Sequence, residues 1–194
     1  MIYGIPNFKL DKSVVIRRSD WLKESGVIFH TNCEVGKDLS FEDLEKKFDA
    51  ILISTGVYKA RSLDLNTEKV SNSIPALEYL IESNKVGLGD KPSLNSHLSA
   101  KNKKVIVIGG GDTAMDCVRT AVRQEASEVI CLYRRNKENM PGSAREVTNA
   151  EQEGVKFKWL SVPSKIVQQN EIASSLVYKV AELGEVDESG RRSP

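Results

Sequence analysis

Short runs of apolar residues alternate with amphipathic segments along this chain. Continuous apolar runs predict buried strands, and strands are expected at 27–29, 50–54, 105–108, 128–133 and 155–160. Helices are expected between them, at 11–26, 41–48, 76–83, 112–124 and 143–153. Two β-rich stretches, 164–169 and 174–181, are predicted to pair as a hairpin. Strands that alternate with helices predict an α/β fold, a parallel sheet with helices on both faces.

Polar residues at the predicted helix starts support these boundaries. Asp11 can cap the first helix, because its side chain can accept from a free backbone N–H of the first turn. Ser40 with Asp43, and Ser143 with Glu146, have the three-residue spacing of a capping box. The sequence therefore predicts a capped start for two of the later helices as well.

The composition divides the chain into three parts. Residues 84–102 are rich in Gly, Ser, Asn and Lys and are predicted to be a linker. Residues 103–194 are then predicted to be one domain ending in a polar tail, and residues 1–83 part of a second domain. Because 1–60 carries predicted strands with few sheet neighbours, this part is expected to be an exposed sheet edge that favours dimerisation or packing on the other domain.

The strand at 105–108 runs directly into six residues with the pattern G-x-G-x-x-A, Gly109-Gly110-Gly111-Asp112-Thr113-Ala114. Gly109 permits a tight exit from the strand, Gly111 lets the backbone approach a pyrophosphate, and Ala114 lets the helix pack closely. The helix start offers unpaired amides and a partial positive charge to phosphates. Because a strand precedes the turn and a helix follows it, a Rossmann-type dinucleotide site is favoured over a merely structural turn.

Asp112 and Thr113 begin the helix after this turn, and two interpretations of them remain open. Both are common residue types at helix starts, where they satisfy backbone amides. Their position also allows contact with the phosphates or the nicotinamide end of a bound cofactor. The sequence does not choose between the two.

The end of the second strand indicates which cofactor the turn would bind. An NAD site has Asp or Glu there to accept from the ribose 2′-hydroxyl. This chain has Arg134 and Arg135 instead, with no carboxylate before Glu138. Two guanidiniums suit the 2′-phosphate of NADPH, which they can grip through bidentate contacts. The alternative is a solvated basic turn, but the glycine pattern upstream favours NADPH.

The remaining composition excludes several functions. The chain has 194 residues and a formal net charge of +1, which gives no reason to expect nucleic acid or an anionic membrane as partner. No apolar run reaches the roughly 20 residues of a membrane helix. Its three cysteines, Cys33, Cys117 and Cys131, form neither a metal pattern nor a disulfide framework, so a reducing cytoplasm is expected. No catalytic triad or carboxylate pair is recognised, and no catalytic or metal-ligating residue is assigned.

Several stretches together resemble the small (beta) subunit of NADPH-dependent glutamate synthase, within the pyridine nucleotide-disulphide oxidoreductase-like proteins. The resemblance covers nearly the whole chain and is carried by residues 3–10, 55–61, 109–119, 133–135 with 139–143, and 182–185 with 189–192. The glycine pattern alone would also match dihydropyrimidine dehydrogenase or thioredoxin reductase. The latter would need a C-x-x-C pair, which this sequence lacks.

This resemblance implies electron transfer from NADPH to FAD for glutamate synthesis, together with a large subunit. The main FAD-binding glycine motif and the cysteine clusters of that family are absent from this chain, so the resemblance implies a central fragment: the NADPH domain plus part of the FAD domain. The leading hypothesis is therefore the NADPH-binding portion of a flavin-dependent oxidoreductase, inactive alone and completed by the remaining flavin-domain segments. The alternative is a non-catalytic nucleotide-binding fragment; a stand-alone NADPH dehydrogenase is the least favoured.

Overall fold

The structure is a computed structural model that divides the chain into two compact units. It describes residues 1–56, 63, 65, 70–186, 192 and 194. The smaller unit is Lys12–Arg61, and the larger unit combines Met1–Asp11 with Ser62–Pro194. This division differs from the expected boundary at 83, because the first eleven residues and those after 62 group with the glycine turn. Most of the resemblance segment 55–61, and residues 187–191 near the C-terminus, lie outside the described residues.

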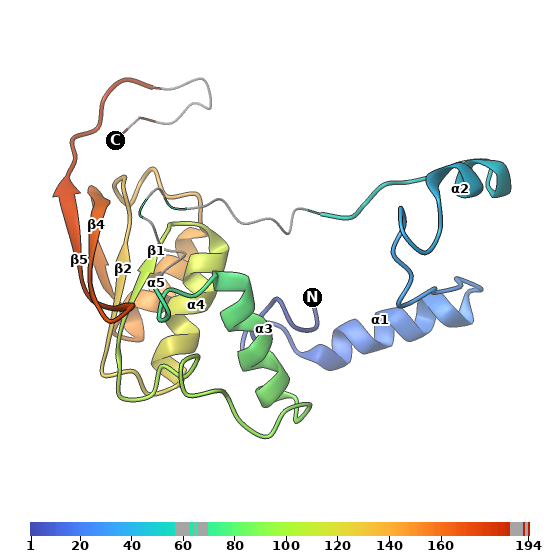
Figure 1. Cartoon of the computed structure of the whole chain (residues 1–194), viewed down its shortest axis with the longest axis horizontal. Coiled ribbons are helices and arrows are strands. Elements are labelled where there is room, and N and C mark those ends of the chain that lie inside the picture. The colour runs from blue at the N-terminus through green and yellow to red at the C-terminus, as the bar shows by residue number, and fades with distance from the viewer. Residues whose placement is uncertain (57–62, 64, 66–69, 187–191, 193) are drawn as a thin grey trace. The chain divides into compact units, whose positions relative to one another are not determined.

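A three-stranded parallel sheet forms the centre of the larger unit (Figure 1). Its order is β1-β2-β3, and β2 pairs with both neighbours. The strands are β1 (Lys104–Ile108), β2 (Glu128–Leu132) and β3 (Lys156–Lys158), and the helices of this unit are α3 (Ala76–Gly87), α4 (Asp112–Arg123) and α5 (Ala144–Gln152). These elements confirm the predicted α/β fold with a parallel sheet.

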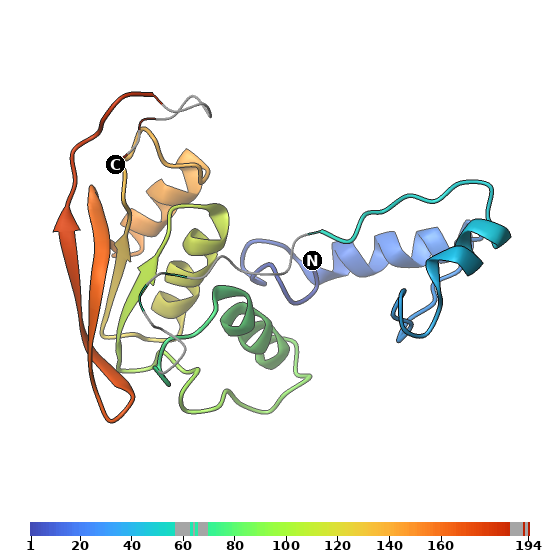
Figure 2. The ribbon, with the colours of Figure 1, turned by 45° about the horizontal axis from the view of Figure 1, so that its top comes forward.

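The two faces of this sheet are covered by different kinds of element. Helix α4 contacts both β1 and β2, and α3 and α5 pack against α4. The other side carries an antiparallel hairpin of β4 (Ser161–Gln169) and β5 (Ile172–Val180), as Figure 2 shows. The hairpin turns at Asn170 and Glu171, whose φ angles of 51° and 62° place both residues in the left-handed region. The predicted hairpin is therefore confirmed, with β4 starting three residues earlier than expected. The prediction of helices on both faces is wrong, because in the described residues this hairpin covers the second face.

The core of the larger unit lies between α4 and the sheet. Helix α4 is amphipathic, and its inward face buries Met115, Val118 and Ala121 completely. Val147 of α5 and Cys131 of β2 close the same cluster. Because apolar burial is the main favourable term in folding, this cluster fixes how α4 starts from the end of β1.

The stretch expected as a linker takes part in this packing. Helix α3 continues to Gly87, so the first residues after 83 are helical. Further along, Leu98 and Ala100 are buried, and the backbone N–H of Ala100 donates to the side-chain oxygen of Gln124 (3.0 Å). The stretch between α3 and β1 is thus a packed part of the larger unit.

The smaller unit holds the helices α1 (Lys12–Glu24) and α2 (Phe41–Lys47). Both helices confirm their predictions, but the strands predicted at 27–29 and 50–54 do not form. The side chains of Ile28 and Leu52 are 78% and 90% exposed. A strand needs a neighbour for its backbone N–H and C=O groups, and no described segment pairs with these two stretches.

The two predicted capping boxes have different outcomes. At the start of α2, the Ser40 hydroxyl accepts from the backbone N–H of Asp43 (3.1 Å), as predicted. At the start of α5, Ser143 makes no side-chain cap bond. Glu146 is engaged elsewhere, since its carboxylate accepts from the Arg119 guanidinium (2.5 Å). Within the described part of the chain, no helix has the length and apolar character needed to cross a membrane.

Candidate nucleotide-binding site

The glycine turn connects β1 to α4, as its sequence predicts. Gly109 has a φ of +145°, which favours glycine, and its N–H donates to the Leu132 carbonyl of β2 (3.1 Å). A Cβ at Gly109 would lie 3.5 Å from the Ala114 Cβ, an ordinary contact. The turn thus leaves β1 tightly, and the small Ala114 lets α4 begin directly beside it.

Gly110 and Gly111 lack side chains for different reasons. A Cβ at Gly110 would come within 2.4 Å of the Tyr133 ring, so this glycine makes room for a buried aromatic side chain. A Cβ at Gly111 would meet no atom within 4 Å. Gly111 is also the N-cap of α4 and brings no capping side chain. Its open side and the free amides of the first helical turn fit the close approach of a phosphate.

Asp112 and Thr113 are both exposed at the first turn of α4. The Asp112 carboxylate accepts from the backbone N–H of Ser143 (3.0 Å). It therefore ties the start of α4 to the start of α5, an arrangement that neither sequence interpretation of Asp112 included. Thr113 has no comparable tie to α5.

A second loop, Asn139–Ser143, lies directly against the glycine turn. The Gly142 N–H donates to the Gly110 carbonyl (2.9 Å), and the Tyr133 hydroxyl donates to the Asn139 carbonyl (3.0 Å). The sequence resemblance included this loop, but its role follows only from these contacts. A glycine close before a predicted helix was the one sequence signal that could have pointed to it.

The residues after β2 alternate between inward and outward directions. The backbone N–H of Tyr133 donates to Lys158, and the carbonyls of Tyr133 and Arg135 accept from Ser161 and Leu160. The chain bends at 134–135, and these bonds hold it there with Tyr133 and Arg135 buried and Arg134 exposed. The Arg135 guanidinium donates to the Arg192 carbonyl (2.6 Å). Arg134 is thus accessible to a ligand, whereas Arg135 is already hydrogen-bonded to Arg192.

Two of the cysteines are structural parts of this region. Burial raises the pKa of the Cys117 and Cys131 thiols to about 12. The Cys131 thiol donates to the Gly109 carbonyl (3.3 Å) from beneath the turn. Neither thiol is ionised near neutral pH, so both act as small apolar side chains, as predicted from their positions.

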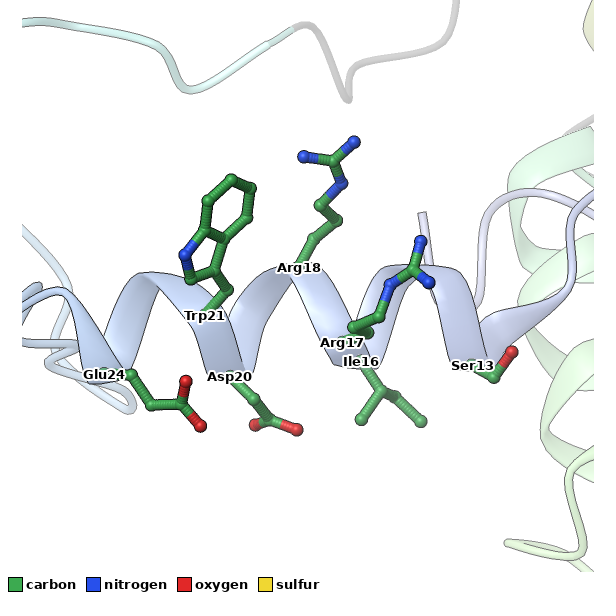
Figure 3. Close-up of a pocket in the computed structure, with 7 residues that line it drawn as sticks. All are labelled: Ser13, Ile16, Arg17, Arg18, Asp20, Trp21 and Glu24. Atoms are coloured by element: carbon green, nitrogen blue, oxygen red, sulfur yellow. The ribbon is translucent and has the colours of Figure 1, made fainter.

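A hollow in the smaller unit does not have the lining of a binding site. All seven side chains that line it come from α1, and Figure 3 shows them projecting along one helix. A single helix cannot enclose a ligand, and no pair of these side chains has a catalytic arrangement. Among the described residues, no group of three or more His, Cys, Asp or Glu side chains could hold a metal ion.

Comparisons with known proteins show the family of this chain. The sequence profile of the pyridine nucleotide-disulphide oxidoreductase family matches residues 20–189. The chain is 50% identical to the glutamate synthase [NADPH] small chain of Azospirillum brasilense over its full length, and 44% identical to that of Escherichia coli over 99% of it. It spans about 40% of the length of these two relatives.

A solved structure shares the fold. Mycobacterium tuberculosis FprA in complex with NADPH superposes with a TM-score of 0.76 over 99% of this chain and 56% of its own. The sequences are 16% identical, so this likeness concerns the fold alone.

Proposed function

The chain belongs to the pyridine nucleotide-disulphide oxidoreductase family, and from that premise we propose that its larger unit binds NADPH for a flavin-dependent oxidoreductase of the glutamate synthase small-chain type. One observation carries the proposal: the glycine turn follows the parallel strand β1, and a Cβ at Gly111, the N-cap of α4, would meet no atom within 4 Å. This is where a parallel sheet with a glycine turn receives a pyrophosphate.

Each residue at the turn has a distinct part in the proposed binding. Gly109 sets the turn, Gly110 accommodates Tyr133, and Gly111 with the first amides of α4 receives the pyrophosphate. Thr113 stands one position further into that first turn, exposed toward solvent, and Asp112 supports the turn through Ser143. The positive end of the helix adds an attraction of about 0.3–1 kcal/mol for a negative group.

Arg134 is proposed as the direct contact to the 2′-phosphate. It is exposed at the carboxyl end of β2, where an NAD-binding protein places its ribose-binding carboxylate. Arg135 was expected to share this role, but its guanidinium is buried and bonded to Arg192. It would reach a phosphate only by giving up that contact. We therefore assign Arg135 to the support of the strand end and Arg134 to the nucleotide.

Electron transfer requires more than this unit. Bound NADPH supplies a hydride, and the proposed acceptor is FAD held by the remaining flavin-domain segments. The resemblance to glutamate synthase small chains then makes the large subunit the final partner, with glutamate as the product. The three free cysteines fit the reducing cytoplasm as its compartment.

A second candidate is a nucleotide-binding module without hydride transfer. The exposed apolar segments around Ile28 and Leu52 favour it, because a flavin site built on these segments would first need them paired into a sheet. The two candidates share the NADPH site and differ in whether the bound nucleotide then gives up its hydride.

A calorimetric titration tests the shared claim. The wild-type chain is titrated with NADPH and with NADH, and the titrations are repeated on Arg134→Ala and on Lys137→Ala. Lys137 is a nearby exposed cation that pairs with Glu151 (2.8 Å), so its loss controls for general charge. We expect a preference for NADPH that Arg134→Ala reduces about ten-fold, roughly 1.4 kcal/mol, and Lys137→Ala leaves intact.

Two results would contradict parts of the proposal. Equal binding of NADPH and NADH by the wild type would contradict the proposed 2′-phosphate site. No binding of either nucleotide would contradict the nucleotide site as a whole. Adding FAD and an artificial electron acceptor to the NADPH-bound chain together with the remaining flavin-domain segments then separates the two candidates. NADPH oxidation in that mixture supports the oxidoreductase, and its absence supports the binding module.

A further inference from the structure

We propose that the loop Asn139–Ser143 is a positioning element that aims the Gly111 amide at the cofactor pyrophosphate. The inference rests on the proposed NADPH site and assigns roles to residues outside the glycine turn. Three hydrogen bonds connect this loop to its surroundings: one to Gly110 of the turn, one to Tyr133, and one to Asp112 at the start of α4. Each contact acts on a different part of the turn.

The first contact fixes the peptide between Gly110 and Gly111. Its carbonyl accepts from the Gly142 N–H (2.9 Å) and therefore points toward the loop. In a trans peptide the C=O and the N–H point in opposite directions. The Gly111 N–H consequently points away from the loop, and the space on the Cβ side of Gly111 is open for 4 Å. Without the Gly142 bond, a glycine pair could rotate this peptide at little steric cost.

In the second contact, one side chain, Tyr133, touches both the loop and the turn. The Tyr133 ring lies so close beneath Gly110 that any side chain there would clash, and its hydroxyl donates to the Asn139 carbonyl (3.0 Å). Tyr133 is buried and packs edge-on against Trp159, with ring centroids 6.4 Å apart. A rigid aromatic side chain thus holds the distance between the loop and the turn.

The third contact controls a charge. Asp112 is the first residue of α4, where its carboxylate would repel a phosphate if it turned toward the helix axis. The Ser143 N–H holds one carboxylate oxygen at 3.0 Å, on the side of α5. The negative charge is therefore kept on the loop side of the helix start, while the amides remain available to the ligand.

Gly142 is the tightest point of this arrangement. A Cβ at this position would lie 3.0 Å from the Gly110 oxygen and 3.4 Å from the Gly111 carbonyl carbon. Alanine here would push on the same peptide whose direction the loop sets. Gly142→Ala should therefore weaken the binding of the pyrophosphate. It should not affect the binding of the 2′-phosphate, because Arg134 follows β2 and the glycine turn follows β1.

Two ligands separate these sites in the test. NADPH carries both phosphate groups, whereas adenosine 2′-monophosphate carries only the one proposed to contact Arg134. We expect Gly142→Ala to weaken NADPH binding about ten-fold and to leave the affinity for adenosine 2′-monophosphate within two-fold of wild type. Arg134→Ala should weaken the binding of both. NMR-detected titration measures the weaker ligand.

A second pair of variants tests the bond to Asp112 alone. Ser143 has a φ of −55°, which proline also adopts, so Ser143→Pro removes its N–H and can keep this φ. Ser143→Ala keeps the N–H and is the matched control. We expect weaker NADPH binding for the proline variant only, and thermal melting verifies that each variant is folded.

The outcomes distinguish this inference from the proposed function. If the wild type binds no NADPH, the proposed function itself is wrong and the inference falls with it. If the wild type binds NADPH and both Gly142→Ala and Ser143→Pro bind it equally well, only the inference is overturned. An equal loss for NADPH and adenosine 2′-monophosphate in Gly142→Ala also overturns it, because the loop would then be a general structural support.

Discussion

Replacing Arg119 by methionine removes a buried cation from between two carboxylates. Arg119 of α4 donates from Nε and Nη2 to one oxygen of Glu153, at 3.0 and 2.7 Å, and from Nη1 to Glu146 at 2.5 Å. Its guanidinium also lies 4.7 Å from the centroid of the Phe8 ring. Methionine keeps much of the apolar volume but leaves both carboxylates without their main partner.

The expected loss follows from the exposure of these groups. The side chains of Arg119, Glu146 and Glu153 are 9%, 13% and 21% exposed. Breaking a fully buried ion pair costs about 3–5 kcal/mol. Here Arg123 still contacts Glu153 (2.8 Å) and the carboxylates retain some water, so we expect a loss of about 2–3 kcal/mol in the free energy of unfolding.

Arg123→Met is the matched control because it shares Glu153 and Phe8 with Arg119 but is 45% exposed. It should cost less than about 1 kcal/mol. Urea unfolding, followed by Trp159 fluorescence in a Trp21→Phe background, reports on the larger unit. If Arg119→Met and Arg123→Met lower the free energy of unfolding equally, burial of the Arg119 ion pairs is not the reason for their contribution to stability.

Three further predictions concern pH, reactivity and the hairpin. Burial raises the pKa of the Asp116 carboxyl although Lys9 bonds to it (2.9 Å), so the folded state binds this proton more tightly and stability falls as pH rises through that pKa. Lys9→Met should therefore lower the melting temperature more at pH 8 than at pH 4; a loss that is larger at pH 4 speaks against it. Iodoacetamide at pH 8 should label the native chain once, at the exposed Cys33, since burial raises the pKa of the other two thiols and keeps them in the unreactive, protonated form. A second label, seen by mass spectrometry on folded protein, would contradict their burial. Glu171→Gly should stabilise the larger unit by about 0.5–1 kcal/mol in urea, because glycine tolerates the φ of 62°; a lower unfolding midpoint would show that the left-handed conformation costs nothing here.

Local patterns predicted the elements whose partners lie nearby in the sequence. The strands β1, β2 and β3, the helices between them and the hairpin all agree with their expected positions within a few residues. The runs at 27–29 and 50–54 have the same apolar character, yet they form no strand. An apolar run shows that a segment favours burial, but a strand also needs a paired neighbour, and that neighbour is a property of the tertiary structure.

The site shows the same limit at the level of single residues. The glycine pattern predicts the tight turn at Gly109 and the open space at Gly111, because both are local properties of the backbone. The pattern could not show that Gly110 has a different role from the other two glycines. Its lack of a side chain makes room for Tyr133, which lies more than twenty positions later in the sequence. Nor could the pattern show that Arg134 and Arg135 face opposite ways, since that depends on how the residues after β2 bond to the β3–β4 connection.

The most direct test of the NADPH site is an amide NMR titration of the ¹⁵N-labelled chain with NADP⁺. If the pyrophosphate binds at the start of α4, the largest shifts should come from the N–H groups of Gly110, Gly111 and Thr113, with a second group at Arg134 that NAD⁺ does not reproduce. Saturation without shifts at the glycine turn, or shifts confined to the smaller unit, would contradict the central claim that this turn is the nucleotide site.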